Sequence, residues 1–157
     1  MTPPEPRAAQ RSRTEMTEIV LPQHANALGT VFGGQVMAWI DICGAVVAHR
    51  HCGRVAVTAA VDGIVFLAPI HVGDIVCLSG RLNAAFNTSL EVEVVVDVED
   101  PATGLRRRCL EALLTFVAVD DQGRPCRVPA LLLEGPEDER RSKAAQARRA
   151  ARIAERA

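Results

Sequence analysis

The segment Gln35 to Arg50 reads QVMAWIDICGAVVAHR and is almost wholly apolar up to its C-terminal end. It follows Gly33-Gly34 and is too long for an ordinary strand, so the pattern predicts a helix. Apolar residues fall on all sides of that helix, which is typical of a helix wrapped by other elements. Basic residues at its end suit the helix dipole, and Gly53 is expected to end it.

The segments around this helix predict strands. Ser89 to Glu99 alternates most clearly, with Leu90 and four valines on one face and acids on the other. The other expected strands are Glu15 to Leu21, Val55 to Leu67, Asp74 to Phe86 and Arg107 to Val119. Arginines 106 to 108 are expected to face the acids of the preceding strand across a hairpin.

This order of elements predicts an α+β fold, in which an antiparallel sheet curls around one long central helix. One small sheet cannot surround a helix. A second subunit is therefore expected to continue the sheet, which makes the protein at least a dimer.

Composition changes at both ends divide the chain into three parts. Residues 1–14 are rich in Pro, Ala and Arg and are expected to form a flexible arm, and residues 15–135 form the folded domain. Residues 136–157 form a charged Ala/Arg-rich tail, in which Pro136 and three following acids favour a solvated, partly formed helix. A nucleic-acid-binding arm is disfavoured because the basic run is short and interleaved with Ala and acids.

The composition also limits the partners. The net charge is −1, Tyr is absent and there is one Trp, so neither nucleic acid nor a membrane surface is an expected partner. The five Cys are odd in number and form no C-x-x-C pair, which favours buried thiols in a reducing compartment. With neither a secretory signal nor a membrane-spanning run in the sequence, the expected location is the cytoplasm.

Asp41 is the first candidate for chemistry, since it stands in the middle of the apolar helix with no Lys or Arg three or four residues away. The alternative is an aspartate on an exposed stripe, or one paired with a distant Arg. Gly33 and Gly34 at the helix start would let a ligand approach bare N–H groups in the manner of an oxyanion hole, or they simply make a turn. Asn26 in the preceding loop is a further candidate, and its alternative is an ordinary turn residue.

Other catalytic arrangements are not indicated. The four His show no metal-ligand spacing, so no metal site is predicted. A G-x-S-x-G elbow, a P-loop and a dinucleotide fingerprint are all missing from the sequence.

Taken together, these segments resemble the hotdog-fold acyl-CoA thioesterases, a family that includes bacterial short-to-medium-chain enzymes and mammalian cytosolic and brain acyl-CoA hydrolases. The resemblance covers roughly residues 17–129, and its motifs occur in order. They are His24 to Gly34, Met37 to Asp41, Gly44 to Cys52, Val57 to Asp62, Phe66 to Ile70 with Gly73-Asp74, Asn87 to Val92, and Gly123-Arg124-Pro125 before Val128-Pro129.

The resemblance implies an acyl-CoA substrate, no separate cofactor, and a dimer or a trimer of dimers, that is, a homohexamer. It implies that Asn26 of one subunit meets Asp41 of another, and that amides around Gly33 and Gly34 hold the thioester carbonyl. Thr88 and Ser89 lie where the family contacts the CoA moiety. Arg124 is taken as a further substrate-binding residue, although a surface salt bridge is an alternative for it.

The expected reaction is hydrolysis of acyl-CoA to free CoA and a carboxylic acid, with Asp41 as general base or nucleophile. His24 departs from the family, in which an acidic residue is common at that position. Two alternatives stay open: an acyl-thioester hydratase of the same fold, with His24 as the nearby base, and a non-catalytic acyl-CoA-binding sensor.

Overall fold

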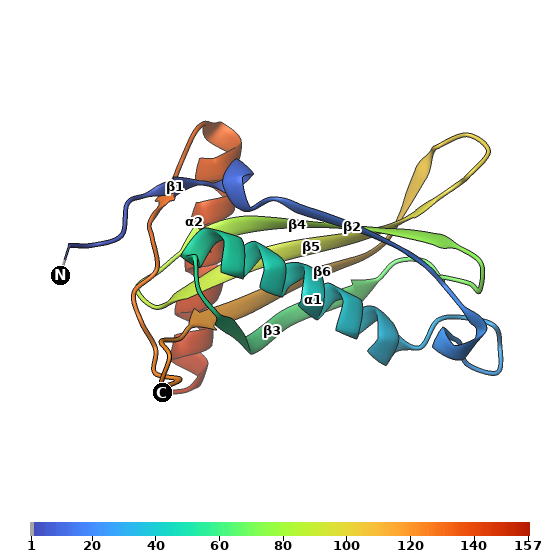
Figure 1. Ribbon diagram of the computed structural model, residues 1–157, viewed down its shortest axis with the longest axis horizontal. Helices are drawn as coiled ribbons and strands as arrows, with labels where there is room; N and C mark the ends of the chain where they lie inside the picture. Colours follow the sequence, from blue (N-terminus) through green and yellow to red (C-terminus); the bar gives the residue numbers. More distant parts are fainter. Residues whose placement is uncertain (1) are drawn as a thin grey trace.

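The computed structural model describes residues 2–157 as one antiparallel sheet, a long helix on its inner face and a second helix on its outer face (Figure 1). The main elements are β2 (Thr14–Ile19), α1 (Gly33–Cys52), β3 (Ala56–Phe66), β4 (Ile75–Ala85), β5 (Ser89–Glu99), β6 (Arg106–Ala118) and α2 (Pro136–Glu155). The smaller elements are β1 (Arg7–Ala8), the 3-10 turns η1 (Ala9–Ser12) and η2 (Pro22–His24), and β7 (Leu131–Leu132).

The sheet has the strand order β2-β4-β5-β6-β3, and every neighbouring pair is antiparallel. The predicted α+β architecture, with a sheet packed on a long central helix, is therefore confirmed. The expected cross-hairpin charge pairs are also present, with Arg108 Nε 2.6 Å from Asp97 Oδ1 and Arg106 Nε 3.5 Å from Glu99 Oε1.

Helix α1 buries one face on the sheet. Val36, Ile40, Cys43 and Val47 recur at three- and four-residue intervals and are fully or almost fully buried. At Gly80 of β4 the strand approaches α1 closely enough that a β-carbon would lie 2.7 Å from Val47 Cγ2. The helix ends as predicted at Gly53, whose φ of 70° is left-handed.

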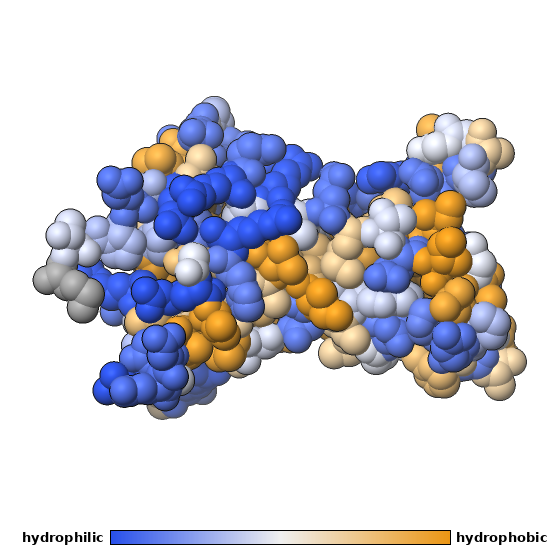
Figure 2. Space-filling model, viewed as in Figure 1, coloured by the Kyte–Doolittle hydropathy of each residue, from blue (hydrophilic) through white to orange (hydrophobic). Residues whose placement is uncertain are grey.

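The opposite side of α1 is not covered by this chain. Met37 and Ile42 are 44% and 54% exposed, and hydrophobic surface gathers over α1 in the view of Figure 2. The wrapping predicted from the all-round apolar pattern is therefore only half supplied within one chain.

The N-terminal segment, predicted to be a flexible arm over residues 1–14, is packed onto the domain from Arg7 onward. Arg7 and Ala8 pair in parallel with Leu131 and Leu132, and the Arg7 guanidinium donates to the His51 carbonyl oxygen at 2.5 Å. These contacts are backbone pairing and a hydrogen bond from the Arg7 side chain to a backbone oxygen. They therefore leave no hydropathy pattern in the sequence.

The C-terminal tail forms a helix that begins at Pro136 as predicted, but one side of this helix is packed rather than solvated. Helix α2 lies across the outer face of the sheet, buries Ser142 and Ala145, and pairs its arginines with acids of the strands. Two acids on the outer face of β5, Glu91 and Glu93, pair with arginines of this helix, and Glu91 is only 1% exposed. Charge complementarity, rather than an apolar stripe, docks this helix.

Candidate active site

Asp41 lies at the middle of α1, on the side that the sheet does not cover. Asp41 is exposed, and its Oδ1 accepts a hydrogen bond of 2.5 Å from the Thr58 hydroxyl of β3. No Lys or Arg side chain in residues 2–157 forms an ion pair with it. Within one chain Asp41 is therefore the exposed aspartate that the sequence left as an alternative, held by one hydroxyl and surrounded by exposed apolar side chains.

Thr58 is the site residue that sequence reasoning missed. It lies in an Ala- and Val-rich strand, where a β-branched Thr is an ordinary strand residue. Only the structure shows that its hydroxyl points to Asp41. A carboxylate that accepts this bond keeps its other lone pairs available and is fixed in orientation.

Asn26 closes the loop that leads to α1. Its Oδ1 accepts from the backbone N–H groups of Leu28 at 2.9 Å and Thr30 at 3.2 Å, and its Nδ2 donates to Thr30 Oγ1 at 2.8 Å. In this chain Asn26 thus has the turn-forming role and forms no hydrogen bond with Asp41.

Gly33 and Gly34 form the first turn of α1. The N–H groups of Gln35 and Val36 donate to the Phe32 carbonyl oxygen, so those of the two glycines precede the first hydrogen bonds of the helix. A β-carbon would meet no atom within 4 Å at Gly34, and only Phe66 Cζ at 3.8 Å at Gly33. No contact among residues 2–157 therefore requires glycine at either position.

Thr88 and Ser89 lie at the turn between β4 and β5, where the Thr88 carbonyl oxygen accepts from the Ala118 N–H at 2.9 Å. Arg124 lies in the turn after β6, and its Nε is 3.1 Å from Asp120 Oδ2. This turn borders an open groove of about 670 Å³ together with residues 53–55 after α1.

These last residues lie at the C-terminal end of α1, whereas Gly33 and Gly34 lie at its start. The helix has 20 residues, so the two ends are separated by about 30 Å. One chain therefore does not bring all the predicted site residues together: it unites Asp41 with Thr58 and leaves the other groups apart.

The buried thiols Cys43 and Cys52 do not supply an ionised nucleophile. Burial raises the pKa of Cys43 and of Cys52 to about 11, which keeps both thiols protonated at neutral pH. In residues 2–157, no cluster of three His, Cys, Asp or Glu side chains could hold a metal ion. Over the same range, neither helix has the length and apolar character needed to cross a membrane.

The chain matches a known protein family and several of its members. The family model described as "Thioesterase superfamily" matches residues 28–105. The uncharacterized acyl-CoA thioester hydrolase YkhA of Bacillus subtilis is 39% identical over 138 residues, which cover 88% of this chain and 80% of that protein. The cytosolic acyl coenzyme A thioester hydrolase of Rattus norvegicus is 36% identical over 141 residues, and the chain spans only 37% of its length.

Solved structures agree. A hexameric acyl-CoA thioesterase in its apo form has a TM-score of 0.91 at 38% identity, with 98% of both chains covered. An acyl-CoA hydrolase of Staphylococcus aureus, solved with butyryl coenzyme A, coenzyme A and coenzyme A disulfide, has a TM-score of 0.89 at 34% identity, with 96% and 92% covered. Variants of that hydrolase with an Asn, an Asp or a Thr replaced by Ala have also been solved.

The fold and the matched segments define a protein of the thioesterase superfamily. Within it, the chain belongs to the hotdog-fold acyl-CoA thioesterases, as the sequence resemblance implied. Its activity is the hydrolysis of acyl-CoA thioesters.

Proposed function

We propose that Asp41 is the catalytic carboxylate of this hydrolysis and that Thr58 orients it. The observation that carries the proposal is the 2.5 Å bond from the Thr58 hydroxyl to Asp41 Oδ1 on an uncovered apolar face. The three positions replaced by Ala in the Staphylococcus aureus hydrolase are an Asn, an Asp and a Thr, in that order. They have the same intervals along the chain as Asn26, Asp41 and Thr58.

As general base, Asp41 takes a proton from a water molecule, and the water oxygen attacks the thioester carbonyl carbon. The C–S bond of the resulting tetrahedral adduct breaks, CoA leaves as a thiolate, and the proton is passed to the thiolate or to solvent. As nucleophile, Asp41 would attack the same carbon, release the thiolate and leave an acyl anhydride that water hydrolyses. Both routes need one ionised carboxylate.

The developing negative charge on the carbonyl oxygen needs donors, and the N–H groups of Gly33 and Gly34 supply them at a helix start. Their first-turn position leaves them without an intrahelical acceptor, and the open space at Gly34 lets a ligand approach the backbone. Backbone amides held by the helix start need no reorganisation at the moment of reaction, which makes their stabilisation of an oxyanion effective.

A second copy of the chain completes the site in this proposal. Asp41 lies on the face of α1 that one chain leaves bare, and burial there would remove water from the carboxylate. In a two-fold pair, Asn26 of one copy would face Asp41 of the other, and the CoA-binding turn at Thr88 and Ser89 would approach the helix start of the partner. Arg124 at the nearby groove is the proposed contact for the CoA phosphates.

The hydratase alternative is not favoured by the environment of His24. Its Nδ1 accepts a hydrogen bond from the Leu21 N–H at 3.0 Å, and its ring packs edge-on against Trp39 with centroids 5.1 Å apart. A His held in this way acts as a structural cap of the loop. The departure from an acidic residue at this position therefore leaves the hydrolytic groups unchanged.

The test is thiol release from acyl-CoAs of increasing chain length, from acetyl to palmitoyl, with wild type beside Asp41→Asn. We expect kcat to fall by about 100-fold or more in the variant, because the amide cannot accept the proton. Glu111→Gln removes an exposed carboxylate of β6 and is the matched control, with wild-type turnover expected. A folded Asp41→Asn variant with wild-type kcat would refute the assignment.

A further inference from the structure

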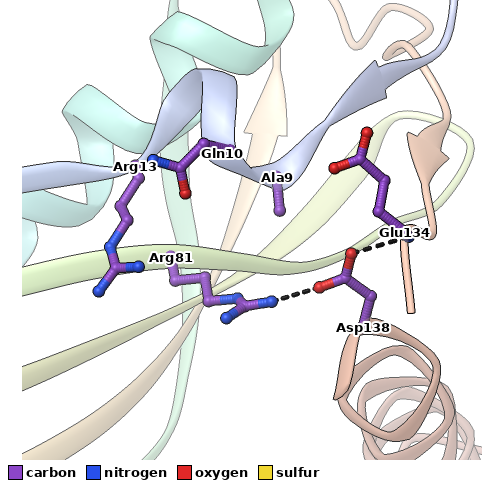
Figure 3. A pocket seen from close by; sticks show the side chains of 6 residues that line it. All are labelled: Ala9, Gln10, Arg13, Arg81, Glu134 and Asp138. Atoms are coloured by element: carbon purple, nitrogen blue, oxygen red, sulfur yellow. Dashed lines mark hydrogen bonds and ion pairs between the residues drawn. The ribbon is translucent and has the colours of Figure 1, made fainter. Parts of the chain in front are cut away.

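Helix α2 is fastened to the outer face of the sheet by a series of ion pairs that runs along its length. Figure 3 shows the first, between Arg81 of β4 and Asp138. Arg141 then pairs with Glu93 of β5, with 2.9 Å between Nη1 and Oε1. Further along, Arg148 pairs with Glu91 at 2.6 Å and Arg152 with Asp62 of β3 at 2.5 Å.

The last of these pairs reaches the edge strand that carries Thr58. Strand β3 is hydrogen-bonded to β6 on one side only, and its register shifts between Thr58 and Ala60 and again between Val61 and Gly63. Ala59 and Asp62 therefore lie outside the regular ladder as bulged residues. An edge segment with two interruptions has few backbone hydrogen bonds to hold it.

Thr58 pairs in register with Phe116 of β6 directly before the first bulge, and the bulged backbone links it to Asp62. In a regular strand, residues four apart project from the same face. Here Thr58 bonds to Asp41 of α1 on the inner face, whereas Asp62 bonds to Arg152 of α2 on the outer face. The irregular backbone between them places the two side chains on opposite faces of the sheet. A shift of the β3–β6 register by one residue would turn Thr58 away from Asp41.

The Arg152–Asp62 pair is well placed to hold that backbone. The two side chains are only 17% and 18% exposed, so solvent screens this pair less than an ordinary surface pair. The residues of α2 that are buried, Ser142 and Ala145, lie in its first half. The Arg152–Asp62 ion pair is therefore a main contact between the last turns of α2 and strand β3.

We propose that Arg152 is a positioning residue for thioester hydrolysis, acting through Asp62 to fix the bulged segment 58–63 so that Thr58 meets Asp41. This inference rests on the proposed roles of Asp41 and Thr58. It assigns a part in catalysis to the Arg-rich C-terminal helix, which lies on the face of the sheet opposite α1.

The first experiment compares Arg152→Ala with Arg140→Ala, whose guanidinium pairs only with Glu137 of its own helix. Arg152→Ala should lower kcat by about three- to tenfold with KM changed less than twofold, because binding groups stay in place while the base is misoriented. Arg140→Ala should match wild type. The reversed pair Arg152→Asp with Asp62→Arg should recover at least half of the lost kcat.

The decisive arm repeats Arg152→Ala in a Thr58→Ala background. If Arg152 acts through Thr58, kcat of the double variant should equal that of Thr58→Ala within about 1.5-fold, since coupled sites are not additive. If Arg152→Ala lowered kcat by the same factor in the wild-type and the Thr58→Ala backgrounds, its role would be merely structural and the proposal would be overturned. An unchanged kcat for Arg152→Ala in an active wild-type background would also overturn it.

Amide hydrogen exchange gives a readout that does not depend on turnover. Residues 58–63 should exchange at least about tenfold faster in Arg152→Ala than in wild type or Arg140→Ala, while the centres of β4 and β5 stay protected. Unchanged exchange at 58–63 would refute the positioning claim even if hydrolysis proceeds as proposed. A wild type that releases no thiol would instead refute the proposed function, and the catalytic part of this inference with it.

Discussion

A single hydroxyl sets the orientation of the proposed base. Thr58 lies 2.5 Å from Asp41 Oδ1, and Asp41 has no cationic partner among the described residues, so loss of the hydroxyl would leave the carboxylate free to rotate. Thr58→Val, which keeps the shape of the side chain, should lower kcat by about tenfold with little change in KM. Thr58→Ser should keep most of the activity. Steady-state kinetics on one acyl-CoA would measure both, and equal losses in Val and Ser would contradict the orienting role.

Gly80 marks the closest approach of sheet and helix. A β-carbon there would lie 2.7 Å from Val47 Cγ2 and 3.1 Å from Cys43 Sγ, inside a fully packed core. Gly80→Ala should therefore lower the free energy of unfolding by about 1–3 kcal/mol through overpacking. Gly34→Ala is the matched control, since a β-carbon there meets nothing within 4 Å. Urea denaturation would compare them, and an unchanged midpoint for Gly80→Ala would refute the packing argument.

Burial of His51 makes the stability of the folded chain depend on pH. Desolvation lowers its pKa, the nearby Arg7 and Arg11 lower it further, and its hydrogen bond to the Pro129 carbonyl oxygen opposes the shift. The unfolded chain takes up this proton near pH 6.5, while the folded chain takes it up only at lower pH. The contribution of His51 to stability is therefore lost as the pH falls from about 6.5 toward the lowered pKa.

Thermal unfolding at pH 7.5 and 5.5 checks this prediction. Wild type should lose Tm between the two pH values, and His51→Gln should lose clearly less, because its side chain takes up no proton. The exposed His49 gives the control His49→Gln, which should show the wild-type drop. An equal drop in all three proteins would assign the pH dependence to other groups.

Among the elements, α2 depends on one buried acid. Glu91 is 1% exposed, and its carboxylate is held by Arg148 from the helix and by Asn83 Nδ2 of β4 at 2.9 Å. Arg148→Ala would leave this carboxylate under the helix without its cation. The free energy of unfolding should fall by about 3 kcal/mol, whereas the exposed Lys143→Ala should change it by less than about 0.5 kcal/mol. Chemical denaturation measures both, and equal effects would contradict a buried pair.

The same elements show what the sequence can predict. The period-two alternation of β5 and the long apolar run of α1 give the sheet, the helix and its end at Gly53 to within two residues, since each pattern reflects burial on one side. Helix α2 and the segment around Arg7 pack through Ala, Ser and Arg. The contacts of α2 depend on charges distant in sequence, and those of Arg7 on backbone groups distant in sequence, which no local pattern reveals.

The candidate site also contains one residue that a local sequence pattern predicts and one that it does not. Asp41 could be found because a charge interrupts an apolar helix. Thr58 could not, because a Thr in a Val-rich strand is ordinary, and the sequence predicts neither its contact with Asp41 nor the two bulges that follow it. The predicted meeting of Asn26 with Asp41 stays a prediction, since it requires two chains.

At the scale of the whole molecule, the exposed apolar surface of β3 and α1 predicts assembly with further copies of the chain. Edge strand β3 exposes Val57, Val61, Val65 and Phe66 by 44–59%, beside the uncovered face of α1. An exposed apolar edge of this length pairs readily with another copy. A relative with a TM-score of 0.91 is described as hexameric.

Val65→Glu should therefore interrupt assembly, because the charge would be buried without a partner in the joined sheet. We expect wild type to run as a multiple of the subunit mass in light scattering, and Val65→Glu to run as a smaller species with kcat lowered by about tenfold or more. Ile153→Glu places the same charge on an exposed apolar position of α2 and should leave both mass and turnover unchanged. A fully active monomer of either variant would show that one chain contains the whole site. The proposed sharing of Asn26 and Asp41 between subunits would then be wrong.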